Sequence, residues 1–164
     1  MSMEAKAGKY LTFALHSEEY GLEILKVREI IGYMSITKVP RTIDHIKGVI
    51  NLRGQVIPII DLRLKFGMPE AEVTEKTCMI VVEALKNGVE KQIGIIVDAV
   101  SEVLDIAQEA MEASPDFGGS VDQSLIQGMA KIESKIIILL DIDRVLFEDG
   151  DFPAETGAVE QVAG

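Results

Sequence analysis

The stretch that decides the fold reads Ile46-Lys-Gly-Val-Ile-Asn-Leu-Arg-Gly-Gln-Val-Ile-Pro-Ile-Ile-Asp-Leu62. Its two apolar runs, 48–52 and 55–60, are separated by Arg53-Gly54, which has the length of a tight hairpin turn. A run such as Val-Ile-Pro-Ile-Ile is apolar on both faces of a strand, so both faces must be covered. The stretch therefore predicts a β-hairpin inside a closed barrel or beneath a second layer.

The same stretch recurs later in the chain. Residues 46–62 align without gaps on residues 126–142, an offset of 80, and residues 20–31 align on 93–104, an offset of 73. Matches in the same order over two segments indicate two copies of one supersecondary unit. The identities are Ile46/Ile126, Gly48/Gly128, Ile57/Ile137, Asp61/Asp141, Gly21/Gly94, Val27/Val100 and Glu29/Glu102.

Other short apolar runs predict further strands, because they are rich in Ile and Val and are bounded by Gly, Pro, Asn or Asp. Asn87-Gly88 is the strongest hairpin signal, and Ser17-Glu-Glu19 and Glu133-Ser134 also lie between strand pairs. The predicted strands are 10–16, 20–24, 48–52, 55–60, 78–84, 92–98, 128–132 and 135–140.

Helical signals are short. Residues 62–66 predict one helical turn that stops at Gly67, and residues 105–124 predict a partly helical connection. Three-to-four spacing of apolar residues predicts further helical turns in two segments. They are 24–31, from Ile24, Val27, Ile30 and Ile31, and 100–104, from Val100, Val103 and Leu104.

These elements predict a mostly β protein of two tandem five-stranded barrel subdomains with a few short helices. Units of about 70–80 residues bury little surface alone, so the two should pack into one body, 9–147, with a groove suited to a partner helix. The expected subdomains are roughly 20–75, and 76–147 together with the strand 9–16. The ends, 1–8 and 148–164, are expected to be flexible tails.

Composition and charge limit the classes of function that the chain can have. The chain has 164 residues, 48% of them apolar and 26% charged, and its net charge of −11 opposes binding to nucleic acid. The single Cys78 lies in an apolar run and is expected in the core, and the absence of a signal core or a long apolar segment predicts a cytoplasmic protein. Residues 26–65 hold eight Lys and Arg against three Asp and Glu, whereas 98–164 hold three against fifteen, which indicates two different faces or simply solvated loops and tails.

No catalytic or metal-binding arrangement emerges from the sequence. His16 and His45 are the only histidines and have no ligand spacing to each other or to the cysteine, and no phosphate loop or nucleophile elbow is present. Asp61 and Asp141 end equivalent strands, where aspartate is usually a cap. We therefore expect no enzyme activity, no metal and no cofactor.

The hairpin 48–62 resembles the signature of the CheW family, the coupling proteins of bacterial chemotaxis. The resemblance covers about residues 9–147 and includes segments 20–30, 94–98 and 139–146. It implies a pair of five-stranded SH3-like barrels. It also implies a non-catalytic adaptor that couples methyl-accepting chemoreceptors to the histidine kinase CheA in membrane-associated arrays.

The resemblance also implies where partners bind. The receptor's cytoplasmic hairpin tip would lie in the groove between the two barrels, where the copies 27–31 and 100–104 are expected to approach each other. The CheA regulatory domain would bind the outer end of the first barrel, and other copies of the chain are a further expected partner in array rings. Expected receptor contacts are Val27, Glu29, Ile30, Val49, Asn51, Leu52, Arg53, Asp98, Val100, Val103 and Leu104; expected kinase contacts are Thr37, Val39, Arg41, Ile43 and Ile46.

Two questions stay open at this level. We expect Arg53 to pair with Glu29 and form a polar rim beside the groove, whereas Val27, Ile30, Val100 and Leu104 fit a core role as well as a contact role.

The function also has alternatives: the coupling module of a CheV-like or pilus-motility pathway, or a small-ligand-binding barrel. A CheV-like protein is expected to continue into a receiver domain, and this sequence ends at Gly164 without one.

Overall fold

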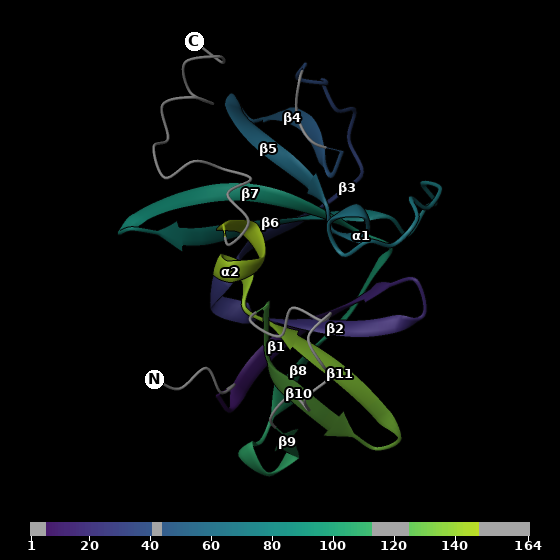
Figure 1. Ribbon diagram of the computed structural model, residues 1–164, viewed down its shortest axis with the longest axis vertical. Coiled ribbons are helices and arrows are strands. Elements are labelled where there is room, and N and C mark those ends of the chain that lie inside the picture. The colour runs from purple at the N-terminus through teal and green to yellow at the C-terminus, as the bar shows by residue number, and fades with distance from the viewer. Residues whose placement is uncertain (1–5, 41–43, 113–124, 148–164) are drawn as a thin grey trace.

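The computed structural model describes residues 6–40, 44–112 and 125–147, which form two small β lobes stacked along the long axis of the molecule (Figure 1). The lower lobe is a sheet with the order β8-β1-β2-β11-β10-β9, and the upper lobe is a sheet with the order β3-β6-β7-β5-β4. The lower strands are β1 (Gly8–Leu15), β2 (Glu18–Glu23), β8 (Ala99–Ile106), β9 (Met111–Glu112), β10 (Ile126–Ile132) and β11 (Lys135–Leu140). The upper strands are β3 (Val27–Gly32), β4 (Ile46–Leu52), β5 (Gln55–Asp61), β6 (Cys78–Lys86) and β7 (Val89–Val97).

The predicted fold class, mostly β with a pair of SH3-like barrels, is confirmed, as is each of the predicted strands. The lower sheet has six strands instead of the expected five because the two-residue strand β9 pairs with β10. The helices of the described residues are all short. They are η1 (Ile24–Lys26), α1 (Leu62–Lys65), η2 (Gln108–Ala110) and α2 (Ile142–Phe147).

The strand register confirms the internal repeat. In the parallel pair β11–β2, Leu139 lies opposite Gly21, and in the parallel pair β5–β7, Ile59 lies opposite Gly94. These residues are related by the offsets of 80 and 73 found in the sequence. Both glycines are needed for close approach, because a Cβ on Gly21 would lie 2.9 Å from the Leu139 side chain and one on Gly94 would lie 2.5 Å from Ile59.

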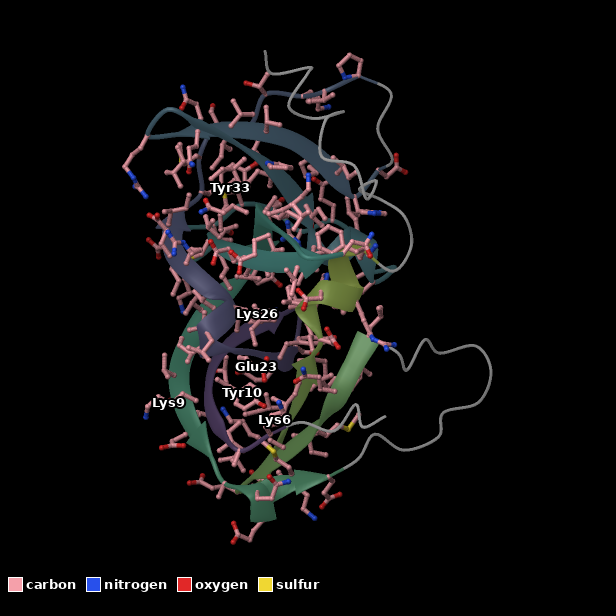
Figure 2. All side chains as sticks on the ribbon, turned by 90° about the vertical axis from the view of Figure 1, so that its left-hand side faces the viewer. Lys6, Lys9, Tyr10, Glu23, Lys26 and Tyr33 are labelled. Atoms are coloured by element: carbon pink, nitrogen blue, oxygen red, sulfur yellow. The ribbon has the colours of Figure 1, made fainter. Side chains whose placement is uncertain are left out.

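The two copies exchange their first hairpins, which corrects the expected subdomain boundaries. The hairpin β6–β7, expected in the second barrel with 76–147, pairs instead with β3 and β5 of the upper lobe, and β1–β2 pairs with β8 and β11 of the lower lobe. The chain crosses between lobes at η1 and again after β7. Figure 2 shows Lys26 of η1 at the level between the lobes. Because each lobe takes strands from both copies, neither copy folds as a separate barrel.

Two of the predicted helical segments are wrong. Residues 24–31 form only the single turn η1 before β3, and residues 100–104 lie within β8. Along β3 the side chains alternate between half-buried and exposed, which is the two-residue period of a strand with one covered face. The turn at 62–66 and its stop at Gly67, which has φ +80, are confirmed. Of the predicted connection 105–124, η2 and β9 are observed, and residues 113–124 lie outside the described part.

A single large core joins the lobes, and each lobe adds a smaller cluster of its own. The central cluster combines side chains from β1 and β2 below, from β6 and β7 above, and from α2, which lies between the lobes (Figure 1). Packed side chains therefore fill much of the space in which a groove was expected. The buried members of the central cluster are Leu11, Phe13, Leu15, Tyr20, Leu22, Ile60, Leu62, Ile80, Val82, Ala84, Ile93, Ile95, Val97, Leu140, Ile142, Val145, Leu146 and Phe147.

Candidate partner-binding surface

The turn between β4 and β5 projects Arg53 away from the core. Arg53 has φ +52 and Gly54 has φ +87, the left-handed conformations that a two-residue hairpin of this type requires. The Asn51 side-chain oxygen accepts a hydrogen bond from the Gly54 amide at 2.9 Å, which fixes the turn. As a result the Arg53 side chain is 68% exposed at the surface of the upper lobe.

Arg53 forms the expected ion pair with Glu29 of β3. The guanidinium Nη2 donates to the Glu29 carboxylate, whose side chain is 32% exposed. The two strands come together because the chain after β3 returns to β4, where Thr37 and Val49 exchange two backbone hydrogen bonds of 2.9 Å. The sequence prediction of this pair is confirmed.

The apolar neighbours of this ion pair differ in burial. Ile30 follows Glu29 on β3, points to the other face of the strand and is 44% exposed, whereas Leu52 is half-buried and packs against the cluster inside the upper lobe. Val27, at the start of β3, packs against the central cluster. Ile30 is therefore available for contact, while Val27 and Leu52 also support the core.

The expected contacts on β8 lie in the other lobe. Val103 is 50% exposed, Leu104 packs against the cluster inside the lower lobe, and Val100 packs against the central cluster. Val27 and Val100 share that cluster, but β3 and β8 run in different sheets, so Ile30 and Val103 belong to separate lobes. The expected receptor contacts thus form an upper set and a lower set that meet at the central core.

Asp98 has a structural role that the sequence analysis missed. Its Oδ1 accepts from Nη1 of Arg63 at 2.8 Å, and its Oδ2 accepts from the His16 amide at 2.5 Å. The Arg63 side chain is only 2% exposed and also donates two bonds of 2.9 Å to Asp61, which in addition caps α1 through the Arg63 amide. These bonds to Asp61 raise the pKa of Arg63, so the guanidinium stays charged in the interior.

The expected kinase contacts lie at the start of β4 and in the segment before it. Thr37 is exposed, while Val39 and Ile46 are half-buried, and Ile46 packs against the central cluster. Arg41 and Ile43 lie outside the described residues. Gly48 approaches Thr37 so closely that a Cβ there would lie 2.1 Å from the Thr37 carbonyl oxygen.

The two strand-ending aspartates are caps, as expected. Asp61 accepts from the Arg63 amide at 3.0 Å, and Asp141 accepts from the Arg144 amide at 3.3 Å. Within the ranges that the structure describes, no three His, Cys, Asp or Glu side chains are grouped as metal ligands. None of the described helices has the length and apolar character needed to cross a membrane.

The described residues form a two-lobed β fold that exposes charged and single apolar side chains on both lobes. The CheW-like domain family matches residues 9–149. A chemotaxis protein CheW from Klebsiella aerogenes is 38% identical over 160 residues, which cover 98% of this chain and 91% of that protein. The chain belongs to the CheW-like family and is a chemotaxis coupling adaptor.

Two further relatives define the extent of the likeness. The crystal structure of the scaffolding protein TtCheW from Thermoanaerobacter tengcongensis matches with a TM-score of 0.77 and 35% identity, over 92% of this chain and 97% of that one. The chemotaxis protein CheV3 from Helicobacter pylori is 29% identical over 129 residues, which are 77% of this chain but only 40% of CheV3. The likeness to CheW therefore spans nearly the whole chain, and the likeness to CheV3 concerns one part of that protein.

Proposed function

We propose that this chain joins the cytoplasmic hairpin tip of methyl-accepting chemoreceptors to the regulatory domain of CheA, without catalysing a reaction itself. It would be recruited in this way to membrane-associated receptor arrays. The observation that carries the proposal is the solvent-accessible ion pair of Arg53 and Glu29 on the upper lobe. The rim of a protein interface is built from solvent-accessible charged groups of this kind.

The ion pair is poorly placed to serve stability. Arg53 is 68% exposed and Glu29 is 32% exposed, and pairs of that exposure contribute only about 0–1 kcal/mol because solvent screens them. The turn nevertheless holds Arg53 in a fixed left-handed conformation and fixes the backbone with the Asn51 side chain. We infer that the turn presents Arg53 for recognition, with Glu29 setting the orientation of the guanidinium.

The kinase would bind the outer end of the upper lobe, around Thr37, Val39 and Ile46. Exposure supports this proposal at Thr37. Tyr33, which precedes this segment, is 39% exposed and lies in the upper lobe (Figure 2). Ile46 contributes to the central cluster, so its substitution would change stability together with binding.

Arg53→Ala tests the receptor surface. We expect it to weaken binding to a purified receptor-tip fragment roughly tenfold, the effect of losing a rim arginine and its hydrogen bonds, and to lower kinase activation in reconstituted arrays. Its melting temperature should stay near that of the unchanged protein. Lys131→Ala is the matched control, because Lys131 also forms an exposed pair, with Glu112 at 3.3 Å, on the lower lobe. Unchanged receptor binding and kinase activation by Arg53→Ala would remove Arg53 from the proposed surface.

The match to CheV3 favours one alternative, the coupling module of a CheV-like protein, and a pilus-motility pathway is a further alternative that the sequence leaves open. The fold is the same in both cases, so the kinase decides. Binding to the regulatory domains of a chemotaxis CheA and of a pilus-motility kinase should be measured side by side. Preference for the chemotaxis kinase supports the main proposal, and preference for the other kinase supports the alternative.

A further inference from the structure

The upper lobe contains an opening between β5 and β7. These parallel strands pair only through Ile59–Gly94, Ile60–Ile95 and Asp61–Ile96. Before these pairs the strands separate around a cleft of about 360 Å³. The cleft is lined by Gln55, Val56, Ile57, Glu83, Glu90 and Gln92.

Pro58 explains why the pairing stops. Tight turns close the hairpins β4–β5 and β6–β7 with the pairs Leu52–Gln55 and Lys86–Val89. The backbone groups of successive residues point to alternate sides of a strand. Those of Pro58 on β5 and of Gln92 on β7 therefore lie at the edges that face each other. The next hydrogen bond of the parallel ladder would run from the amide of residue 58 to the carbonyl of Gln92. Proline has no amide hydrogen, so the ladder ends at Ile59.

The second copy of the unit serves as an internal comparison. Ile138 occupies the position of Pro58, and there the parallel pairing with β2 continues through Ile138–Tyr20 to Ile137–Glu19. The equivalent extension in the upper lobe, Ile57 with Gln92, is not formed. The opening therefore belongs to the Pro58 copy and is not a general property of the repeat.

The hairpin β6–β7 also extends past its neighbours. Strand β3 pairs with β6 only as far as Val82, and β5 reaches β7 only at Gly94, whereas the hairpin continues to Lys86 and Val89. Outward-facing backbone groups of Glu90 and Gln92 lie in this extension, next to the cleft. A strand edge that the described residues leave uncovered can pair with an extended peptide.

The side chains around the cleft select the charge of such a peptide. Glu83 and Glu90 are carboxylates, and the described residues that line the cleft include no lysine or arginine, although Arg28 reaches Glu83 from β3 at 3.7 Å. Val56, which lines the cleft, is 45% exposed and offers an apolar contact. A strand with alternating basic and apolar side chains would satisfy both features, because its side chains alternate between two faces.

We propose that the cleft between β5 and β7 is a second docking site, which takes a basic extended segment of a partner protein as an added strand along Glu90 and Gln92. Arg53 and Glu29 are not among the residues that line the cleft, although Gln55 directly follows the Arg53-Gly54 turn, and the lining includes none of the described residues of the proposed kinase surface.

The probe is a seven-residue peptide of alternating lysine and valine, titrated into the isotope-labelled full chain and followed by amide chemical shifts. We expect saturable binding below about 1 mM, with the largest shifts at Val56, Glu90 and Gln92. The double variant Glu83→Gln/Glu90→Gln should weaken binding roughly fivefold for the loss of two partly exposed charge contacts. Glu112→Gln, an exposed glutamate of the lower lobe, is the matched control and should change nothing.

Two control peptides separate strand addition from simple charge attraction. A peptide of alternating glutamate and valine should fail to bind, and the lysine peptide with methylated backbone amides should lose binding because it cannot donate to β7. Equal binding of the methylated peptide, binding of the acidic peptide, shifts centred elsewhere or no saturation overturns the proposal. If the free chain self-associates with the same shifts, the occupant is a second copy and the assignment to a foreign partner is wrong.

Discussion

Nη1 of Arg63 lies 2.8 Å from Oδ1 of Asp98, an ion pair that joins helix α1 to the point where the chain crosses from the upper to the lower lobe. The other crossing has an equivalent pair of reversed sign. There Nζ of Lys26 lies 2.9 Å from the carboxylate of Asp143 in α2. Arg63 and Asp143 are related by the offset of 80, so the two copies have exchanged which element carries the positive charge.

Both carboxylates also hold a hairpin. Asp98 accepts the amide of His16 at 2.5 Å, and Asp143 accepts the amide of Leu85 at 2.8 Å. His16 and Leu85 are equivalent positions of the two copies. His16 lies four residues after Thr12, which pairs with Gly21, and Leu85 lies four residues after Val81, which pairs with the equivalent Gly94. Each crossing is therefore fixed by one carboxylate, one cation and one hairpin amide.

Arg63→Met should destabilise the protein by about 3–5 kcal/mol, because it leaves the carboxylate of Asp61 buried without its cation. Urea unfolding at neutral pH measures the loss. Lys131→Met removes an exposed pair from the lower lobe and should change stability by less than about 1 kcal/mol. A loss below about 1 kcal/mol in Arg63→Met would mean that the buried charges are compensated in another way.

Gly48→Ala should destabilise by at least about 3 kcal/mol, combining left-handed backbone strain with a steric clash. Gly48 has φ +141, and its new Cβ would lie 2.1 Å from the backbone oxygen of Thr37, which cannot move without breaking the bridge to Val49. Gly54→Ala is the matched control: its φ is +87, but no atom lies within 4 Å, so the cost should be about 1–2 kcal/mol. Thermal unfolding of both variants makes the comparison, and equal losses would contradict the steric argument.

Val103→Ser and Ile30→Ser should weaken binding of the receptor-tip fragment while leaving the melting temperature nearly unchanged. Both side chains are about half-exposed, so their truncation costs less than about 1 kcal/mol of stability. Val97→Ser, fully buried in the central cluster, should instead lose about 2 kcal/mol or more through the cavity and the buried hydroxyl. Stability losses of that size at Val103 and Ile30 would identify them as core residues.

Alkaline pH should destabilise the protein through Tyr10. Burial, and secondarily the nearby Glu23, raises the pKa of Tyr10 above its ordinary value; the three residues Lys6, Tyr10 and Glu23 lie close together in Figure 2. A raised pKa means that Tyr10 ionises first in the unfolded chain. The contribution of protonated Tyr10 to the free energy of unfolding is therefore complete below about pH 10 and disappears as the pH rises through the pKa of the folded state. Tyr10→Phe should flatten the fall in unfolding free energy above about pH 10. At neutral pH it should cost about 1 kcal/mol, for the hydrogen bond of 2.6 Å to the Lys6 carbonyl. An unchanged alkaline slope would contradict this role.

Local patterns predicted the strands and turns well. The hairpin signals at Arg53-Gly54 and Asn87-Gly88 depend on neighbouring residues alone, and Arg53, Asn87 and Glu133 all adopt the positive φ of tight hairpins. The repeat was also visible, because equivalent close contacts keep equivalent residues, such as Gly21 and Gly94. The ion pair of Arg53 and Glu29 followed from the family resemblance and is confirmed.

Long-range pairing was not visible in the same patterns. Nothing in the order of strands distinguishes two separate barrels from two that exchange hairpins, because both arrangements bury the same apolar runs. In β3 and β8 the apolar residues Val27, Ile30 and Ile31, and Val100, Val103 and Leu104, fall at three-to-four spacing, which favours a helix by pattern alone. Arg63 resembles any helical arginine in sequence; its burial depends on Asp98, 35 residues away.

The most direct test of the central claim is a pull-down of the full chain with a receptor-tip fragment and the CheA regulatory domain, separately and together. We predict that each partner is retained alone and that all three proteins are recovered in one complex, since the proposed surfaces use different residues. Competition between the two partners, or retention of only one of them, would contradict the claim that this protein bridges receptor and kinase.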